Sequence, residues 1–242
     1  MTGAMIDLHA MSRVAVVVPP SNPIVEPELA ALLGADTALY GSRLPRYVDF
    51  NLRQRNQLYV RAYSAALDSL AGLNTHAALI AMTGPNYRYG LAGDMALAAD
   101  LSRRFDAPVR TASLAIHDTL ATMGERRIQL LSPYPDWLTA DAVEYWSGAG
   151  YEIEAVHQYF TSGSDFRAYD TTSDEVAQAL DSITSHVPIV LTGTGLATLS
   201  ALRSAAGDTL LLSSNLCGAW WLVQQLGLSG TALYHALVAD LP

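Results

Sequence analysis

The sequence repeats one pattern in its two halves, and this repeat constrains the fold more than any other feature. Three elements recur: an apolar run that ends in a turn, a second apolar run that stops at Thr-Gly, and a strand followed by Ser and a helix that ends in Gly. They lie at 14–22, 79–84 and 109–124, and again at 128–136, 189–193 and 210–227. A period of roughly one hundred residues is too long for a solenoid, whose repeats are about 20–50 residues, and predicts two related α/β lobes facing each other across a cleft.

Short apolar runs bounded by turn residues indicate strands of a parallel sheet that is covered on both faces. Helical patterns alternate with these runs, which favours right-handed crossovers and parallel pairing. Strands are expected at 13–18, 36–41, 77–82, 108–112, 127–132, 152–158, 187–192 and 209–213. Helices are expected at 26–33, 52–70, 91–105, 114–123, 137–148, 173–185, 196–205 and 216–226.

The predicted fold class is therefore α/β, with two pseudo-symmetric lobes and an active-site cleft between them. Each lobe is expected to hold a parallel four-stranded sheet flanked by helices. The expected N-terminal lobe is 13–112 and the C-terminal lobe is 113–228, with a last helix within 229–242 that packs back on the N-terminal lobe. A chain of 242 residues with 50% hydrophobic content is large enough to build such a core.

Charge and composition narrow the classes of partner. All fourteen basic residues are Arg, so neither a lysine Schiff base nor a P-loop lysine is available. The formal net charge is −9, without basic clusters, which argues against binding to nucleic acid or to an anionic membrane. A small-molecule partner is expected.

Cysteine use and the absence of targeting features indicate a cytoplasmic protein. The single cysteine, Cys217, leaves no partner for an intrachain disulfide. No apolar run approaches the about 18–20 residues of a membrane-spanning helix, and Met1 to Ser12 has the character of a loose leader rather than a secretion signal. No metal-binding motif or cofactor fingerprint is present, so we expect no metal and no cofactor. The long helices favour a homodimer.

In a sheet of this kind, ligands bind outside the carboxyl ends of the strands. The residues that follow the expected strands are rich in hydroxyls, amides and glycine and poor in carboxylates. Unpaired N–H groups at the adjoining helix starts would add to the attraction for negative charge. The loops are therefore suited to an anion, such as a carboxylate.

Four separated motifs at these loops carry a resemblance to a known family. They are Pro-x-Ser-Asn followed by Glu within 16–28, Thr-Gly-Pro-Asn-Tyr-Arg-Tyr-Gly at 83–90, Ser-Pro-Tyr at 132–134, and Ser-Ser-Asn with Ala-Trp within 213–220. With these motifs the chain resembles the aspartate/glutamate racemase superfamily, and within it the branch of maleate isomerases and arylmalonate decarboxylases. The resemblance covers residues 14 to about 228, almost the whole chain.

The chain departs from that branch at the residues that carry its chemistry. The resembling racemases and isomerases present a cysteine at the end of each pseudo-symmetric strand, whereas Met82 and Gly193 occupy those positions here. The decarboxylase branch keeps one cysteine, at the second position. Cys217 does not replace either thiol, because it falls within the last helix, and Phe166 stands where the isomerases have an asparagine.

The resemblance implies a site that binds a carboxylate or the enediolate formed from it. In that site Asn22, Thr83, Gly84, Tyr134 and Thr194 would hold the negative charge. The leading hypothesis is a cofactor-independent lyase or isomerase of decarboxylase type, acting on a small carboxylic acid without two-thiol racemisation. Decarboxylation, elimination and hydration all remain open. A tyrosine, His117 or water would deliver the proton in place of the cysteines.

The candidate residues fall into two groups, catalytic and substrate-binding. The catalytic candidates are Asn22, Thr83, His117 and Tyr134. The substrate-binding candidates are Pro20, Ser21, Arg43, Met82, Gly84, Tyr87, Tyr89, Ser132, Gly193, Thr194 and Asn215.

Several candidates have a purely structural interpretation that the sequence leaves open. Asn22 fits a helix cap as well as a ligand contact, and Tyr134 fits a packed ring with a satisfied hydroxyl. Arg43 fits an exposed ion pair as well as a bidentate contact to a carboxylate. The segment 87–89 fits a surface loop as well as a lid. The competing function is a non-catalytic carboxylate binder, or a pocket adapted to a larger natural product by a cyclase, dehydratase or hydrolase.

Overall fold

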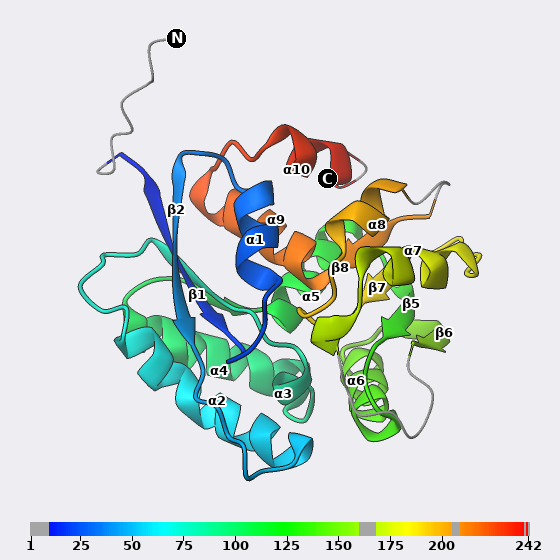
Figure 1. Ribbon diagram of the computed structural model, residues 1–242, viewed down its shortest axis with the longest axis horizontal. Helices are drawn as coiled ribbons and strands as arrows, with labels where there is room; N and C mark the ends of the chain where they lie inside the picture. Colours follow the sequence, from blue (N-terminus) through cyan, green and yellow to red (C-terminus); the bar gives the residue numbers. More distant parts are fainter. Residues whose placement is uncertain (1–9, 160–167, 205–208, 240, 242) are drawn as a thin grey trace.

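The computed structural model describes residues 10–159, 168–204, 209–239 and 241, and it contains two four-stranded parallel sheets (Figure 1). The first sheet has the order β2-β1-β3-β4, with β1 at Ser12–Val18, β2 at Thr37–Arg43, β3 at Ala77–Ile80 and β4 at Val109–Thr111. The second has the matching order β6-β5-β7-β8, with β5 at Arg127–Ser132, β6 at Glu152–Gln158, β7 at Ile189–Leu191 and β8 at Leu211–Ser213. The predicted fold class and the eight predicted strands are confirmed.

The helices connect successive strands, as the alternating pattern predicts. In the first half they are α1 (Val25–Leu32), α2 (Leu52–Asp68), α3 (Gly84–Tyr87), α4 (Gly90–Phe105) and α5 (Ala112–Met123). In the second half they are α6 (Asp136–Gly148), α7 (Ser173–Asp181), α8 (Leu199–Ser204), α9 (Ser214–Leu226) and α10 (Ala232–Leu237), with a 3₁₀ turn, η1, at Ala168–Asp170. The short α3 is not predicted from the sequence, because Gly84 and Pro85 at its start are typical of a turn.

Alternate residues of the inner strands serve two separate cores. In β1, Ala15 and Val17 belong to a cluster with Tyr63 of α2, while Val14 and Val16 belong to a second cluster with helices on the opposite face. Side chains of a strand alternate between the two faces of a sheet, so a continuous apolar run is what a doubly covered strand requires. The uninterrupted Val14–Val18 run is therefore explained by helices on both faces.

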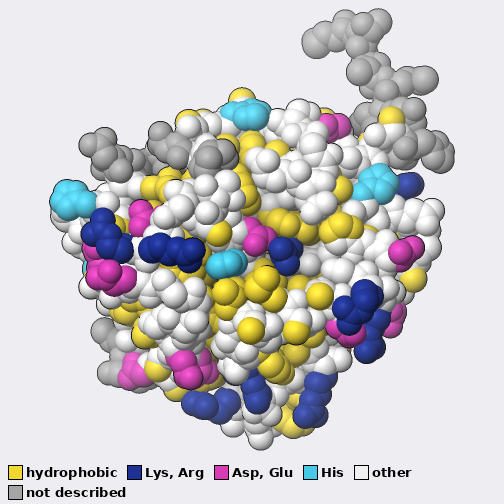
Figure 2. All heavy atoms as spheres, turned by 180° about the vertical axis from the view of Figure 1, so that it is seen from behind, with side chains coloured by type: hydrophobic (Ala, Val, Ile, Leu, Met, Phe, Trp, Pro, Cys, Tyr) yellow, Lys and Arg dark blue, Asp and Glu magenta, His cyan; other side chains and the backbone are white. Residues whose placement is uncertain are grey.

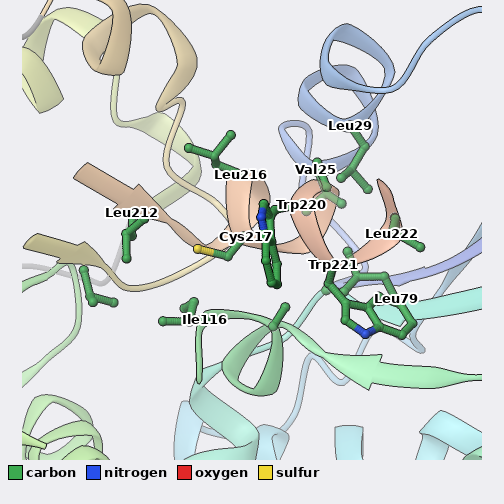
Figure 3. Packing of buried hydrophobic residues seen from close by; sticks show 14 of the residues in the cluster. Val25, Leu29, Leu79, Ile116, Leu212, Leu216, Cys217, Trp220, Trp221 and Leu222 are labelled. Carbon is green, nitrogen blue, oxygen red and sulfur yellow. The ribbon is translucent and has the colours of Figure 1, made fainter. Parts of the chain in front are cut away.

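The second cluster joins the two lobes around α9. Figure 3 shows Cys217, Trp220 and Trp221 of this helix among side chains from α1, β3, α5 and β8. A Cβ built on Gly218 would lie 2.7 Å from a methyl carbon of Leu79 in β3, which shows how closely α9 approaches the first sheet. The predicted C-terminal lobe therefore contains a helix that packs against the N-terminal sheet, while the boundary at 112/113 stays a prediction.

The recurring strand, hydroxyl, helix and glycine pattern has a structural basis. The Thr111 hydroxyl accepts a hydrogen bond from the backbone N–H of Leu114 at the start of α5, and the Ser213 hydroxyl accepts one from Leu216 at the start of α9. Gly124 and Gly227 end these helices with φ of 70° and 62°. Such caps satisfy the free groups at helix ends. Both caps sit at equivalent positions of the two lobes.

The described C-terminal residues return to the first lobe. Thr231, which precedes α10, donates from its backbone N–H to Leu32 at 2.9 Å and from its hydroxyl to Ala31 at 2.7 Å. These bonds attach α10 to the end of α1, where it also lies in Figure 1.

The surface and the helix lengths bear on possible partners. On the face shown in Figure 2, basic and acidic side chains lie interspersed. None of the helices in the described ranges has both the length and the apolar character needed to cross a membrane. Within the same ranges, no three His, Cys, Asp or Glu side chains are grouped so that they could hold a metal ion.

Candidate active site

A cavity of about 460 Å³ lies where the carboxyl ends of the two sheets meet. The four inner strands β1, β3, β5 and β7 all lead into it, as expected for a ligand site in a parallel sheet. Its lining residues are Pro19, Pro20, Ser21, Met82, Thr83, Gly84, Pro85, Tyr134, Leu138, Gly193, Thr194 and Gly195, together with Arg46, Tyr47, Val48, Leu52, Arg55, Asn56, Tyr59 and Tyr169.

Tyr134 and Thr83 face each other in this cavity. Their hydroxyls share a hydrogen bond of 2.5 Å, which connects the loop after β5 to the loop after β3. Burial raises the pKa of Tyr134 to about 12, although hydrogen bonds with Thr83 and with the backbone N–H of Gly84 oppose the increase. The Tyr134 side chain is thus protonated near neutral pH and can donate a hydrogen bond or a proton.

Gly193 leaves the space beside the Tyr134 hydroxyl open. Its φ is +92°, in a region that residues with a Cβ rarely adopt. A Cβ built on Gly193 would lie 3.2 Å from the Tyr134 hydroxyl oxygen and 3.2 Å from Cγ of Pro133. Met82 lines the same cavity from the end of β3 and is 6% exposed. The cavity therefore has a glycine and a thioether at the two equivalent strand ends.

Asn22 lies behind the cavity wall rather than in its lining. Its Oδ1 accepts hydrogen bonds from the backbone N–H groups of Ile24 at 2.8 Å and Val25 at 3.2 Å, as the helix-cap interpretation requires. Its Nδ2 donates to the carbonyl oxygen and the hydroxyl of Thr194, at 3.2 and 3.3 Å. The Thr194 hydroxyl in turn donates to the carbonyl of Ala81 at 2.9 Å. Asn22 thus joins the loops that follow β1 and β7.

A buried carboxyl group supports the 193–195 loop from below. Nδ2 of Asn215 donates to the Thr194 carbonyl at 3.2 Å and to Glu28 at 2.8 Å. Glu28 also accepts from the backbone N–H groups of Thr198 at 2.5 Å and Leu199 at 3.1 Å. Burial raises the pKa of Glu28, and these hydrogen bonds oppose the increase. Asn215 is therefore placed in a supporting layer, outside the cavity lining.

Arg43 and Ser132, both candidates for binding substrate, also lie outside the lining. Arg43 forms an ion pair with Glu26 and donates to the carbonyl of Asn22 at 2.9 Å, so the ion-pair interpretation describes its place in the fold. Ser132 is buried and shares a hydrogen bond of 2.7 Å with the hydroxyl of Thr139. Each stabilises a loop next to the cavity.

Three sequence-predicted residues lie away from the cavity. Tyr87 is buried and packs edge-on against Tyr134, with ring centroids 6.3 Å apart. Tyr89 is 42% exposed and borders a separate depression. His117 lies in α5, where its Nδ1 is 2.9 Å from the Tyr151 hydroxyl, and burial lowers its pKa. Of the predicted proton donors, Tyr134 is the one in the lining, and the geometry does not place 87–89 as a lid.

The structure adds residues that the sequence analysis did not select. They are Arg46, Tyr47, Arg55, Asn56, Tyr59 and Tyr169. One signal was present: residues 52, 55, 56 and 59 have the i, i+3, i+4, i+7 spacing of one helix face. The predicted second strand ends at residue 41, whereas β2 continues to Arg43, so the loop that carries Arg46 and Tyr47 begins later than predicted. Phe166 lies outside the described residues.

Comparisons with known proteins agree with this fold. A sequence model described as arylmalonate decarboxylase matches residues 14–236. The chain is 26% identical over 153 residues to a maleate isomerase of Geobacillus stearothermophilus, a match that covers 58% of this chain and only 61% of that relative.

Solved structures show the same architecture. A maleate isomerase from Pseudomonas putida S16 superposes with a TM-score of 0.83 at 19% identity, covering 93% of this chain and 99% of that one. A crystal structure of arylmalonate decarboxylase gives a TM-score of 0.74 at 18% identity, covering 92% of this chain and 96% of that one. These likenesses show a shared fold.

Proposed function

The chain belongs to the arylmalonate decarboxylase family, and from this membership we propose that it is a cofactor-independent lyase of decarboxylase type acting on a carboxylic acid. One observation carries the proposal: the hydroxyls of Thr83 and Tyr134 and the 193–195 loop border a single cavity between the lobes. Among the described residues, the lining contains no Asp or Glu that would repel a carboxylate. The cavity is therefore suited to a negatively charged substrate.

The proposed reaction passes through an enediolate. The bond between the α-carbon and one carboxylate breaks, that group leaves as carbon dioxide, and the electron pair enters the remaining carboxylate to form the enediolate. The Thr83 hydroxyl and backbone N–H groups of the 193–195 loop would hold this charge. Preorganised donors of this kind contribute roughly 3–4 kcal/mol each to stabilising a developing oxyanion.

Tyr134 is the proposed proton donor. Its proton passes to the α-carbon of the enediolate, and the resulting tyrosinate takes a proton from water. The hydroxyl lies next to the point where a side chain at position 193 would emerge, and the resembling decarboxylases carry their cysteine at that position. Met82 and Gly193 offer no acid, and Cys217 is fully buried with a pKa raised to about 12 by its burial. The proposal therefore excludes thiol chemistry.

A second candidate is a larger substrate held in the same cavity, or a binder without catalysis. A volume of about 460 Å³ is within the range of about 300–1,000 Å³ that holds drug-sized ligands. Gly193 enlarges the cavity on one side because it has no side chain. Deuterium exchange at the α-carbon of a bound acid in deuterated water separates the enzyme from the binder.

The Tyr134→Phe variant tests the mechanism. We expect kcat for decarboxylation of a 2-substituted malonic acid to fall about 10²- to 10⁴-fold, the usual contribution of a general acid. Binding of the acid should persist, because Thr83 and the 193–195 loop are retained. The measurements are release of carbon dioxide, incorporation of deuterium into the product, and the dissociation constant of the acid.

Two further variants serve as controls. Tyr151→Phe removes a buried hydroxyl that is bonded to His117 away from the cavity, and Cys217→Ala removes the thiol. Both should keep the kcat of the unmodified protein. Unchanged turnover in Tyr134→Phe would exclude Tyr134 as the donor. Binding of malonic acids without turnover or exchange would contradict the lyase and support the binder.

A further inference from the structure

The cavity has a second side that the proposed reaction does not use. The connection between β2 and α2 contributes Arg46 and Tyr47, and the first turns of α2 contribute Arg55 and Tyr59. Tyr169 of η1 completes this side. The rings of Tyr47 and Tyr59 lie 5.6 Å apart, centroid to centroid, and form an aromatic wall. We call these five residues the arginine arm.

The arginine arm carries positive charge that no described protein group neutralises. Neither Arg46 nor Arg55 forms an ion pair with an acidic residue of the described ranges. By contrast, Arg43 is paired with Glu26 at the edge of the same region. Although the chain has a net charge of −9, the described lining of the cavity holds these two arginines and no Asp or Glu.

Arg55 is the better placed of the two arginines. Its Nε is buried and has no hydrogen-bond partner among the described residues. Burial raises the pKa of Tyr59 and of Tyr169, and the positive charge of Arg55 opposes the increase at both hydroxyls. A buried donor without a partner has a cost in stability, because it has lost its hydrogen bonds with water. An acceptor supplied by a ligand would remove this cost.

We propose that the arginine arm binds a second anionic group of the substrate. The proposal rests on the proposed function for the other end of the molecule, where Thr83 and the 193–195 loop hold the reacting carboxylate. Guanidinium groups bind carboxylate and phosphate through paired N–H donors. The substrate class is therefore an elongated acid with a negative charge at each end, and the intervening carbon chain contacts Tyr47 and Tyr59.

A binding series with the intact protein tests this inference. The probes are a monocarboxylic acid, straight-chain dicarboxylic acids of increasing length, and a carboxylic acid with a terminal phosphate, each measured by calorimetry. We expect the affinity to reach a maximum at one chain length and to exceed that of the monoacid of equal length by about tenfold or more, the usual value of a charged hydrogen bond. If the probe with the terminal phosphate binds more tightly than the dicarboxylic acids, the second group is a phosphate. If a dicarboxylic acid binds more tightly, the second group is a carboxylate.

Variants of α2 connect the effect to Arg55. Arg55→Gln should lower the affinity for the best dianion by about tenfold and leave the affinity for the monoacid unchanged. Arg55→Lys keeps the positive charge but not the paired N–H donors, so its affinity for the dianion should fall less than that of Arg55→Gln. The matched control is Arg53→Gln, since Arg53 lies in the same helix but stacks on Trp137 at 4.3 Å and borders a different depression.

The outcomes separate this inference from the proposed function, because binding does not require turnover. Equal affinities for monoacid and dianions, or equal losses in the Arg53 and Arg55 variants, would overturn the arginine arm. A malonic acid with a terminal anionic group that binds through Arg55 and is never converted would leave the arm in place and contradict the lyase.

Discussion

Asp94 of α4 shows how the fold sets the ionisation of a single residue. Its side chain is fully buried, and Oδ2 accepts hydrogen bonds from Thr111 at 2.9 Å and Tyr145 at 3.1 Å, while Oδ1 has no partner among the described residues. Burial raises the pKa of Asp94 from 3.8 to about 6, although these bonds and the charge of Arg110 oppose the increase. Compared with the unfolded chain, the folded state therefore shifts Asp94 toward the protonated form.

The raised pKa predicts a pH dependence of stability. Below about pH 3.8, Asp94 is protonated in both the folded and the unfolded state, and its contribution to stability is fully present. This contribution is lost as the pH rises through about 6, because the unfolded chain releases the proton at a lower pH than the folded protein does. The Asp94 contribution to the free energy of unfolding should fall by up to about 3 kcal/mol over this window. The Asp94→Asn variant should lack this decrease in denaturant titrations from pH 4 to 7.

The pKa of Glu28 is also raised, so Glu28 contributes to the pH dependence in the same direction. The difference between the pH profiles of the unmodified protein and of Asp94→Asn gives the part that comes from Asp94. Asp100→Asn is the control, because Asp100 is on the same helix but is partly exposed and paired with Arg103 and Arg104. Parallel profiles for the unmodified protein and Asp94→Asn would contradict the assignment.

Among the elements, α2 connects the core to the arginine arm. One face places Tyr63 and Ala66 on the first sheet, and its first turns place Arg55 and Tyr59 at the cavity. Asn51 begins the helix with a capping box: its side chain accepts from the N–H of Gln54 at 3.0 Å, and the Gln54 side chain accepts from the N–H of Asn51 at 3.1 Å. The cap fixes the turn that carries Arg55.

Loss of this cap should affect stability and binding together. Asn51→Ala removes one capping bond and should lower the free energy of unfolding by about 1 kcal/mol. Because the first turn frays more readily, the affinity for the best dianion should also fall, while that for the monoacid should not. Asn51→Asp keeps the acceptor and should behave as the unmodified protein in thermal unfolding and calorimetry. A loss of monoacid binding in Asn51→Ala would contradict a local effect.

At the scale of the molecule, buried polar contacts join the two lobes at the cavity. Glu28 of α1 receives hydrogen bonds from Thr198, Leu199 and Asn215 of the second half. Asn22 and Thr194 form a second link one layer closer to the cavity. These groups bring the carboxyl ends of the two sheets to a fixed separation, on which the width of the cavity depends.

Removing the Glu28 carboxyl group should weaken the whole assembly. Glu28→Gln replaces an acceptor oxygen by an amide NH₂ and leaves at least one buried donor unpaired, so the free energy of unfolding should fall by about 1–3 kcal/mol. Thermal unfolding measures the effect. The control, Glu26→Gln, breaks only the partly exposed pair with Arg43 and should cost less than about 1 kcal/mol. Equal losses in both variants would show that Glu28 does not hold the lobes together.

Local pattern in the chain was enough to predict the eight strands, the two lobes and the loops that border the cavity, and the resemblance of four loop motifs predicted the family. Strand and helix periodicity depend on neighbouring residues, and the repeated Thr-Gly and Ser motifs mark the strand ends at which the cavity forms. The resemblance to the family's motifs at these strand ends implied Thr83, Tyr134 and Thr194 as site residues, and all three lie in the lining.

Pattern did not predict which polar side chains line the cavity, because that depends on contacts between segments far apart in the chain. Arg43 follows β2 as expected, yet Glu26 of α1 occupies its guanidinium, and Arg55 of the next helix lies in the lining instead. His117 follows a strand end but is bonded to Tyr151. A side chain's partners are set by how the helices rotate and pack on the sheets, and only the tertiary structure determines this packing.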